Sequence, residues 1–353
     1  MPKRLRYIAI AVALLVVSGV AWHLGKPLPT PVTPIGKHSY ALALQSAHAG
    51  KAGAARLLYQ QLSRHDLSAV RQASLLAELH NYPSAPALKY ATAGLHSKQL
   101  LVRHAAIDCI RDLVSPAQRS LLLGPLLDDD DQETRFHAAR AMIDLTPDDQ
   151  GLYFGALQKV LDQYIQALEQ RPDDNDAQLQ LARLYLNADD YTQARRALTQ
   201  ARILQPQDLD GVPIEVRILE GQHQPDQARQ VLAEQLQRHP ESAFLQAELG
   251  QWLLRNKLPE YAFLALTRAV ELEPDNIDYR YKLAMALHGL DQVEAAQRQL
   301  DEILRRQPAD RKARVLLIEY WKQTGQLQNV QVLLAELEQQ NPDDPALQQG
   351  SGR

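Results

Sequence analysis

The apolar positions in the C-terminal half of the chain repeat with a period of 34. Within each unit a small residue such as Ala182 is followed three positions later by a large one such as Tyr185. Further along, an alanine such as Ala194 is followed four positions later by a leucine such as Leu198. Spacings of three and four residues place side chains on one face of an α-helix. The pattern therefore predicts two antiparallel helices per unit, with small and large side chains interlocking between them.

Proline marks the end of each unit. It recurs with the same period and without a slip, at Pro172, Pro206, Pro240, Pro274, Pro308 and Pro342. Because proline cannot continue a helix, each of these positions predicts the end of a helix pair. Asp-rich dipeptides such as Asp173-Asp174 follow, and they supply turn and N-cap chemistry for the next helix.

This pattern resembles tetratricopeptide repeats. The resemblance covers five units between about residues 175 and 344, preceded by a helix from about 153 to 170. The second unit departs from the family pattern, because Gly211, Pro213 and Glu215 stand in its first helix, which we expect to be short or irregular. The resemblance implies stacked helix pairs with a concave groove lined by the first helix of each unit.

A second period, of 32 rather than 34, lies upstream of these units. It spaces three segments that each open an apolar helix, namely Val70-Arg71, Val102-Arg103 and Thr134-Arg135. A Leu-rich helix at 121–127 and an acidic turn at 128–131 lie between the last two. This arrangement resembles compact HEAT-type repeats. The expected fold class is therefore all-α, an α-solenoid with HEAT-like helical pairs at 39–148, about five tetratricopeptide repeats within 149–345, and a disordered tail at 346–353.

The order of HEAT-type pairs followed by tetratricopeptide units also resembles the C-terminal half of a family of bacterial multihaem c-type cytochromes. The resemblance covers about Ser68 to Pro345, and the haem domain of that family has no counterpart here. Cys109 is followed by Ile110 and Arg111, so the chain has no covalent haem site. The resemblance implies an extracytoplasmic protein with a link to c-type cytochromes, but electron transfer itself is not carried over.

The first residues predict a membrane segment. Lys3, Arg4 and Arg6 precede an uncharged apolar run at 7–24, which as a helix would span roughly 27 Å. A cleaved signal peptide is the alternative, with Gly19-Val20-Ala21 as the cleavage site. We favour an anchor at 1–25 followed by a Pro-rich linker at 26–38. Positive charge before the segment predicts a single-pass inner-membrane protein with a cytoplasmic N-terminus and its bulk in the periplasm of a Gram-negative cell.

Charge and motif content exclude several classes of function. With 38 Lys+Arg against 42 Asp+Glu, the net charge of -4 gives no basic footprint for nucleic acid. The histidines lack the spacing of helical metal ligands, and the Asp128 to Asp131 run lacks the pattern of a calcium loop, so it reads as a solvated turn. The lone Cys109 is expected to be buried and inert. No catalytic motif is present, so we expect neither a cofactor nor a metal nor an enzyme.

A partner-binding groove is the remaining functional surface. Positions that face the groove in tetratricopeptide proteins are, by this resemblance, Leu179, Arg183, Asn187, Arg217, Gln251, Arg255, Tyr281, Met285, His288, Glu319 and Lys322. The mixed chemistry suits an extended peptide or a partner helix. Arg183 and Arg217 would stack near one end of the groove and pair with a partner carboxylate, or would only keep the solenoid soluble.

The expected function is that of a membrane-anchored periplasmic scaffold or adaptor that binds a protein or peptide partner in this groove. The alternative is an assembly factor or holdase for an exported client such as an apocytochrome. The basic and asparagine positions of the chaperone-type carboxylate clamp are not reproduced, so capture of a free peptide C-terminus is not indicated.

Overall fold

The computed structural model describes residues 39–350, and all regular structure in that range is helical. From Tyr40 on, the described residues belong to one compact unit. The helices before the 34-residue units are α2 (Tyr40–His48), α3 (Ala54–Leu62), α4 (Ala69–Glu78), α5 (Ala85–Leu95), α6 (Leu100–Leu113), α7 (Pro116–Leu123), α8 (Gln132–Arg140) and α9 (Pro147–Gln150), with 3₁₀ turns at Leu79–Asn81, Gly124–Asp128 and Gly151–Tyr153.

The 34-residue units form the predicted helix pairs. After α10 (Phe154–Glu169) come α11 (Asn175–Asn187) with α12 (Tyr191–Leu204), α13 (Gly211–Gly221) with α14 (Pro225–Arg238), α15 (Ala243–Arg255) with α16 (Pro259–Leu272), α17 (Ile277–Gly289) with α18 (Val293–Arg306), α19 (Arg311–Gln323) with α20 (Leu327–Gln340), and finally α21 (Pro345–Gly350). The all-α fold and the five units are confirmed.

Two local predictions concern proline and glycine. Helix α13 has 11 residues where the first helices of the other units have 13, because Pro213 is tolerated only in the first turn of a helix. The expected short first helix of the second unit is thus confirmed. The single helix expected at 121–127 is wrong: α7 ends at Leu123, and the chain tightens into a 3₁₀ turn because Pro125 cannot donate the next helical hydrogen bond.

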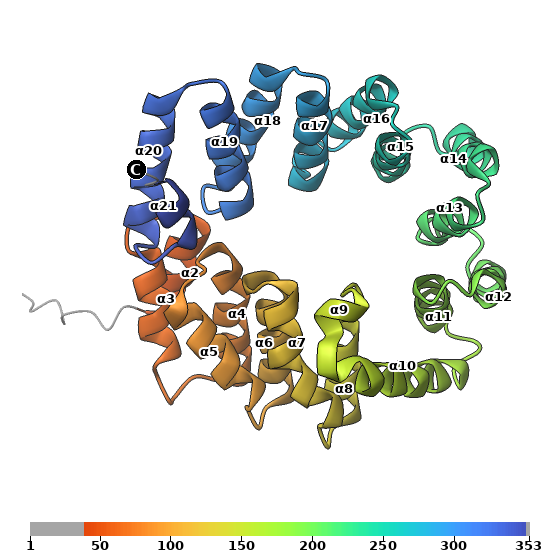
Figure 1. Ribbon diagram of the computed structural model, residues 1–353, viewed down its shortest axis with the longest axis horizontal. Helices are drawn as coiled ribbons and strands as arrows, with labels where there is room; N and C mark the ends of the chain where they lie inside the picture. The colour runs from red at the N-terminus through yellow and green to blue at the C-terminus, as the bar shows by residue number, and fades with distance from the viewer. Residues whose placement is uncertain (1–38, 351–353) are drawn as a thin grey trace, which may run out of the picture. The chain divides into compact units, whose positions relative to one another are not determined.

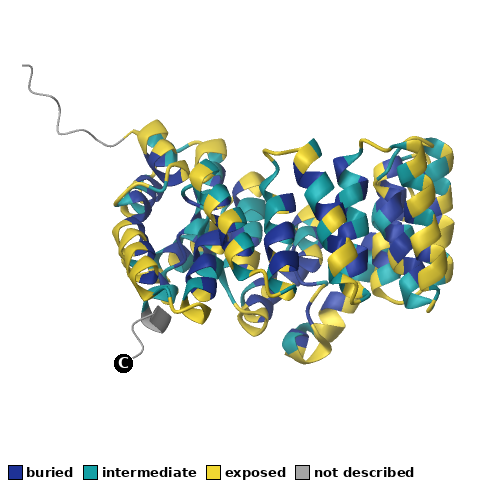
Figure 2. Ribbon diagram, turned by 90° about the horizontal axis from the view of Figure 1, so that it is seen from above, coloured by how far each residue is buried: buried dark blue, intermediate teal, exposed yellow. Residues whose placement is uncertain are grey.

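Small and large side chains interlock between the two helices of a unit, as the sequence predicts. Gly250 of α15 faces Leu266 of α16 so closely that a Cβ at position 250 would lie 2.5 Å from Leu266 Cγ. Leu266 is fully buried, as are Ala284 and Leu300 at the corresponding places of the next unit. Buried and exposed residues alternate along the helices (Figure 2). The core therefore runs between the helices of each pair and between neighbouring pairs.

The turn between the two helices of each unit carries a residue in the left-handed region. These residues are spaced by 34 and have φ between 57° and 73°: Asp189, His223, Lys257, Asp291 and Gly325. Only the last is a glycine. A side chain with a Cβ costs roughly 1 kcal/mol in this conformation, and aspartate tolerates it better than histidine or lysine does. Two of the five turns therefore keep an avoidable backbone strain.

Replacing His223 or Lys257 by glycine is expected to raise the free energy of unfolding by about 0.5–1 kcal/mol each, because glycine adopts the left-handed region without strain. Both side chains are exposed. Urea denaturation followed by circular dichroism measures the effect. The reverse change, Gly325→Ala, serves as the control and should lower stability by a similar amount. A loss of stability in both glycine variants would contradict this account of the turns.

The two ends of the compact unit meet, which the sequence did not predict. The Gly53 amide donates to the Gln339 carbonyl at 2.7 Å, and Asn341 Nδ2 donates to the Pro83 carbonyl at 2.8 Å. Ala309 belongs to the same buried cluster as Ala43 and Ala47. Within this unit the helices follow one another around a ring, and α20 and α21 lie beside α2 and α3 (Figure 1). We call this contact the seam.

The concave groove expected from the repeats is closed into a ring in the structure (Figure 1). Each helix pair is rotated slightly relative to the previous one, and these small rotations add up along a solenoid. Here the accumulated curvature brings the last unit against the first helices. The core shows no break at 148: one buried cluster extends from Ala43 through Leu145 and Leu157 to Ile218.

Two predictions fall at the ends of the chain. The anchor at 1–25 and the linker at 26–38 lie outside the described residues. Among those that are described, no helix is long and apolar enough to cross a membrane. The tail predicted as disordered at 346–353 needs correction, because Pro345–Gly350 form helix α21. Asp344, at the start of this helix, accepts a hydrogen bond from the Ala346 amide at 2.8 Å, which is the N-cap chemistry that the sequence assigned to the other units.

Candidate partner-binding surface

The first helix of each early unit faces the inside of the ring. Figure 1 shows α11, α13 and α15 on the inner side and their partners α12, α14 and α16 on the outer side. We call the surface formed by the first helices the inner wall. Eight of the eleven predicted groove residues carry side chains that are exposed or line a hollow on these helices: Arg183, Asn187, Arg217, Arg255, Tyr281, Met285, Glu319 and Lys322.

Four of these residues line one hollow of about 490 Å³ at the C-terminal ends of α11, α13 and α15. They are Arg183, Asn187, Arg217 and Arg255. We call this the arginine hollow. The other residues that line it are Leu186, Asp189, Tyr191, Glu220 and Gly221. The 34-residue period explains the gathering, because Arg183 and Arg217 occupy the same position in consecutive units, as do Asn187, Gly221 and Arg255 in three.

Glu220 holds two of the three guanidinium groups. Its carboxylate lies 3.1 Å from Arg255 Nη2 and 3.7 Å from Arg217 Nε. Asp189 accepts a hydrogen bond from the Tyr191 hydroxyl at 2.8 Å. Within residues 39–350, Arg183 makes no ion pair or hydrogen bond, and its side chain is exposed. The hollow therefore presents one unmatched cation beside two that are already oriented.

A second hollow, of about 590 Å³, lies where the inner wall approaches the seam. The last two repeat units contribute Tyr281, Lys312 and Glu319 to its lining. The region before the repeats contributes His80, from the 3₁₀ turn after α4, and Asp112, from α6. Lys312 Nζ lies 4.1 Å from the centre of the Tyr281 ring, which is within the range of a cation–π contact. Burial raises the pKa of Tyr281, so its hydroxyl stays protonated at neutral pH and can donate a hydrogen bond.

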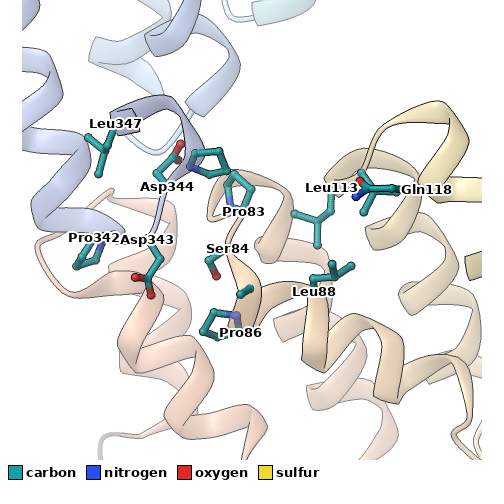
Figure 3. Close-up of a pocket in the computed structure, with 13 residues that line it drawn as sticks. Pro83, Ser84, Pro86, Leu88, Leu113, Gln118, Pro342, Asp343, Asp344 and Leu347 are labelled. Carbon is teal, nitrogen blue, oxygen red and sulfur yellow. The ribbon is translucent and has the colours of Figure 1, made fainter. Parts of the chain in front are cut away.

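A third hollow, of about 550 Å³, lies at the seam itself. Figure 3 shows Pro83, Ser84 and Pro86 on one side of it and Pro342 and Asp343 on the other. The neighbouring Asp344 is fully buried and receives two hydrogen bonds from Arg311, at 2.7 and 2.8 Å. This ion pair joins the start of α19 to the residue before α21, so the carboxylate of Asp344 is not available to a ligand in this hollow.

Family models match two parts of the chain. Residues 152–211 and residues 256–332 each match a model described as tetratricopeptide repeat. These two segments contain tetratricopeptide repeats. Neither model describes a catalytic domain, and repeats of this kind are typically non-catalytic binding scaffolds. The matches do not reach residues 39–148, so the HEAT-type assignment and the link to c-type cytochromes stay predictions.

Solved structures of similar proteins include several tetratricopeptide proteins. The yeast Tom70 structure is 13% identical, with a TM-score of 0.46, and the likeness covers 88% of this chain and 78% of that one. A thermophilic TPR protein of Thermus thermophilus, TTC0263, is 21% identical, with a TM-score of 0.41 and coverage of 58% and 98%. YrrB, titled a TPR protein with an unusual peptide-binding site, is 18% identical, with a TM-score of 0.37 and coverage of 53% and 96%. A comparison with curated proteins found no match.

The three remaining predicted groove residues differ in how far their side chains are free to contact a partner. Gln251 is half-buried. The His288 ring stacks on Tyr320 at 4.0 Å between centres, and its Nε2 lies 2.7 Å from Gln323 Oε1. Leu179 is only 4% exposed and belongs to the core, next to Gly211. Its side chain therefore offers no groove surface.

Sequence reasoning missed several residues that shape the arginine hollow. Glu220 pairs with Arg255, which lies 35 positions later, so the contact joins two neighbouring units. A period of 34 does not reveal such a pair, since the two residues hold different positions in their units. Tyr191 was likewise missed, because it opens α12, the second helix of its unit.

Other candidate chemistry of the sequence has structural roles. In residues 39–350 no group of three His, Cys, Asp or Glu side chains could hold a metal ion. Asp131 caps α8 by accepting from the Thr134 amide at 2.8 Å and lies 3.6 Å from Arg103. Cys109 is 3% exposed, and burial raises its pKa to about 12. A thiol with so high a pKa stays protonated, which makes it a poor nucleophile.

Proposed function

We propose that this chain is a membrane-anchored periplasmic scaffold that holds a protein partner against the inner wall of its tetratricopeptide repeats. The observation that carries the proposal is the gathering of Arg183, Arg217 and Arg255 with Asn187 in one exposed hollow. Exposed arginines are common on protein surfaces, but three from successive units converging on one concave site are typical of recognition.

The anchor and the periplasmic location rest on the sequence. Basic residues before the apolar run at 7–24 support an N-terminus in the cytoplasm and export of the rest. The Pro-rich stretch at 26–38 supports a spacer that holds the scaffold away from the bilayer. The scaffold would thus act close to the membrane, where a tethered partner gains effective concentration.

The closed ring restricts how a partner reaches the inner wall. Unless the seam opens, a partner must insert an extended segment or a single helix into the ring. Grooves of other proteins bind polypeptides in both of these forms. We therefore expect the bound element to be a narrow segment of a larger protein rather than a broad folded face.

The test is a crosslinking pull-down from intact membranes with the wild-type chain and the double variant Arg183→Ala, Arg217→Ala. We expect the double variant to recover at least about fivefold less of the partner, which corresponds to about 1 kcal/mol. Arg298→Ala is the matched control, because Arg298 is an exposed arginine of α18, the second helix of its unit, and does not line the arginine hollow. Unchanged recovery of every partner by the double variant would show that the inner wall is not the binding face.

The recovered material also discriminates between a scaffold and a holdase. A scaffold recovers a folded partner that contains its cofactor. A holdase recovers precursors that lack it, for example an apocytochrome. Mass spectrometry of the crosslinked complex and its haem absorbance measure the difference.

A further inference from the structure

We propose that the arginine hollow binds the carboxylate of an acidic side chain in the partner. This inference rests on the proposed function, since it specifies the chemistry of the segment that the inner wall holds. It is carried by two features of the hollow: an unmatched arginine, and two further arginines that share a single carboxylate, Glu220.

The charges of the hollow do not cancel. Among the residues that line the hollow, Arg183, Arg217 and Arg255 stand against two carboxylates, Glu220 and Asp189. Glu248, which does not line the hollow, also interacts with Arg255. Glu220 accepts from Arg255 Nε at 3.2 Å and also lies near Arg217, so it serves two cations. Asp189 is engaged by the Tyr191 hydroxyl. One positive charge is left over, although the chain as a whole carries a net charge of -4.

The unmatched cation is well suited to a carboxylate. A guanidinium presents five N–H donors in a planar fork that matches the two oxygens of a carboxylate. All the donors of Arg183 are available within the described part of the chain. Arg217 keeps its terminal nitrogens, because only its Nε faces Glu220. A carboxylate that enters the hollow would therefore meet Arg183 first and Arg217 beside it.

Gly221 makes room for the ring of Tyr191, another residue that lines the hollow. It is the last residue of α13, at the position that Asn187 and Arg255 hold in the neighbouring units. A Cβ there would lie 2.5 Å from the ring of Tyr191, so no other residue fits without displacing that ring. The glycine therefore fixes where the Tyr191 ring lies among the residues that line the hollow. Asn187 also lines the hollow, and its Nδ2 donates to the Ile143 carbonyl at 3.4 Å.

A single carboxylate fits the hollow better than a phosphate does. The ends of α11, α13 and α15 that form the hollow are C-terminal ends, which carry partial negative charge. Glu220 and Asp189 add to this, so the excess of one cation can balance a monoanion but not a dianion. The hollow also lies in the middle of the inner wall, between units on either side. A segment that runs through the ring would present an internal Asp or Glu there, and no chain end is needed.

The experiment uses the full chain and three short alanine-based peptides in ligand-observed NMR titrations at low salt. The first peptide is capped at both ends and contains one glutamate, the second replaces that glutamate by glutamine, and the third is the glutamine peptide with a free C-terminal carboxylate. We expect the glutamate peptide to bind roughly threefold to fivefold more tightly than the glutamine peptide. Raising the salt concentration should remove this difference, because the site is exposed.

Variants of the protein assign the effect to the hollow. Arg183→Ala should reduce the preference for glutamate to below about twofold, and the control Arg298→Ala should leave it unchanged. Glu220→Gln should increase the affinity for the glutamate peptide by roughly threefold, because a competing carboxylate is removed while its size is kept. A merely structural role of Glu220 would instead weaken binding.

Equal binding of the glutamate and glutamine peptides to the wild-type protein would overturn the proposal. So would a preference that survives Arg183→Ala, or tighter binding of the peptide with the free C-terminus, which would assign the carboxylate to a chain end. Inorganic phosphate that competes more strongly than acetate would also contradict it. These failures leave the scaffold itself standing if the double variant still loses its partner in the pull-down. Discrimination between the peptides with unchanged pull-down would refute the scaffold instead.

Discussion

Replacing Gly50 by alanine is expected to open the seam and turn the ring into an open solenoid. Gly50 has φ of 56°, and a Cβ at this position would lie 2.6 Å from the Pro308 carbonyl oxygen. The obstacle is backbone, which cannot rotate away as a side chain can, so the two ends of the unit must separate. Small-angle X-ray scattering should show a larger radius of gyration, and the Gly53 amide should exchange its hydrogen faster.

Gly53→Ala is the matched control for this change. Gly53 also lies in the left-handed region, with φ of 73°, but nothing lies within 4 Å of a Cβ built there. Both variants lose roughly 1 kcal/mol to backbone strain, and only Gly50→Ala adds a clash across the seam. A scattering profile of Gly50→Ala that matches that of Gly53→Ala would show that the seam adapts without opening.

The seam is the part of the ring most easily opened. Besides the buried Ala309, it is held by single hydrogen bonds: Gly53 to Gln339, Arg311 to Asn81 at 3.3 Å, and Asn341 to Pro83. A hydrogen bond of this kind contributes about 0.5–1.5 kcal/mol, far less than a well-packed helix pair. Contacts with few apolar partners open first in a folded protein. A partner too broad to thread the ring would therefore reach the inner wall through the seam.

The repeating part of the fold was predictable because its information is local. Pro172 and its equivalents end the helix pairs, and the small residues that face leucines, such as Gly250 and Leu266, fix how the two helices pack. Each of these signals acts within a single repeat unit. The same holds for the shortened α13, whose Pro213 has a purely local effect.

Ring closure was not predictable in the same way. Its contacts join residues more than 200 positions apart, such as Asn81 with Arg311, and they follow no period. Whether such residues meet depends on the summed rotation of all the helix pairs between them, to which every unit contributes a little. A sequence pattern shows that a solenoid curves in one direction, but it does not give the total angle.

The candidate site was predictable in part. Positions in the repeat predicted that Arg183, Asn187, Arg217 and Arg255 line a common surface, because equivalent residues of successive units lie on the same face of the solenoid. They did not predict the role of Glu220, which pairs with a residue of the next unit, or the burial of Leu179 in the core. Both misses have one physical cause: position in the repeat fixes which way a helix face points, whereas neighbouring side chains decide what the residue contacts.

Gly250→Ala is expected to lower the free energy of unfolding by about 1–3 kcal/mol, because the added methyl group overlaps a fully packed leucine. The Cβ would lie 2.5 Å from Leu266 Cγ and 2.8 Å from its Cδ2. Leu266 is fully buried, so its side chain cannot move aside into solvent. In a helix without such a neighbour the same change should stabilise by roughly 0.5–1 kcal/mol. Gly289→Ala provides that control, since nothing lies within 4 Å of a Cβ at Gly289 of α17.

The double variant Gly250→Ala, Leu266→Ala tests whether the loss of stability comes from the clash with Leu266 or from another effect of alanine at position 250. Leu266→Ala alone should cost about 2–5 kcal/mol, because it leaves a cavity at a fully buried site. In the double variant the new methyl group enters that cavity, so the combined loss should fall short of the sum of the single losses by at least about 1 kcal/mol. Urea unfolding followed by circular dichroism gives the three values. Additive losses would mean that the two side chains do not meet, and the interlocking of small and large residues that defines each repeat would have to be abandoned.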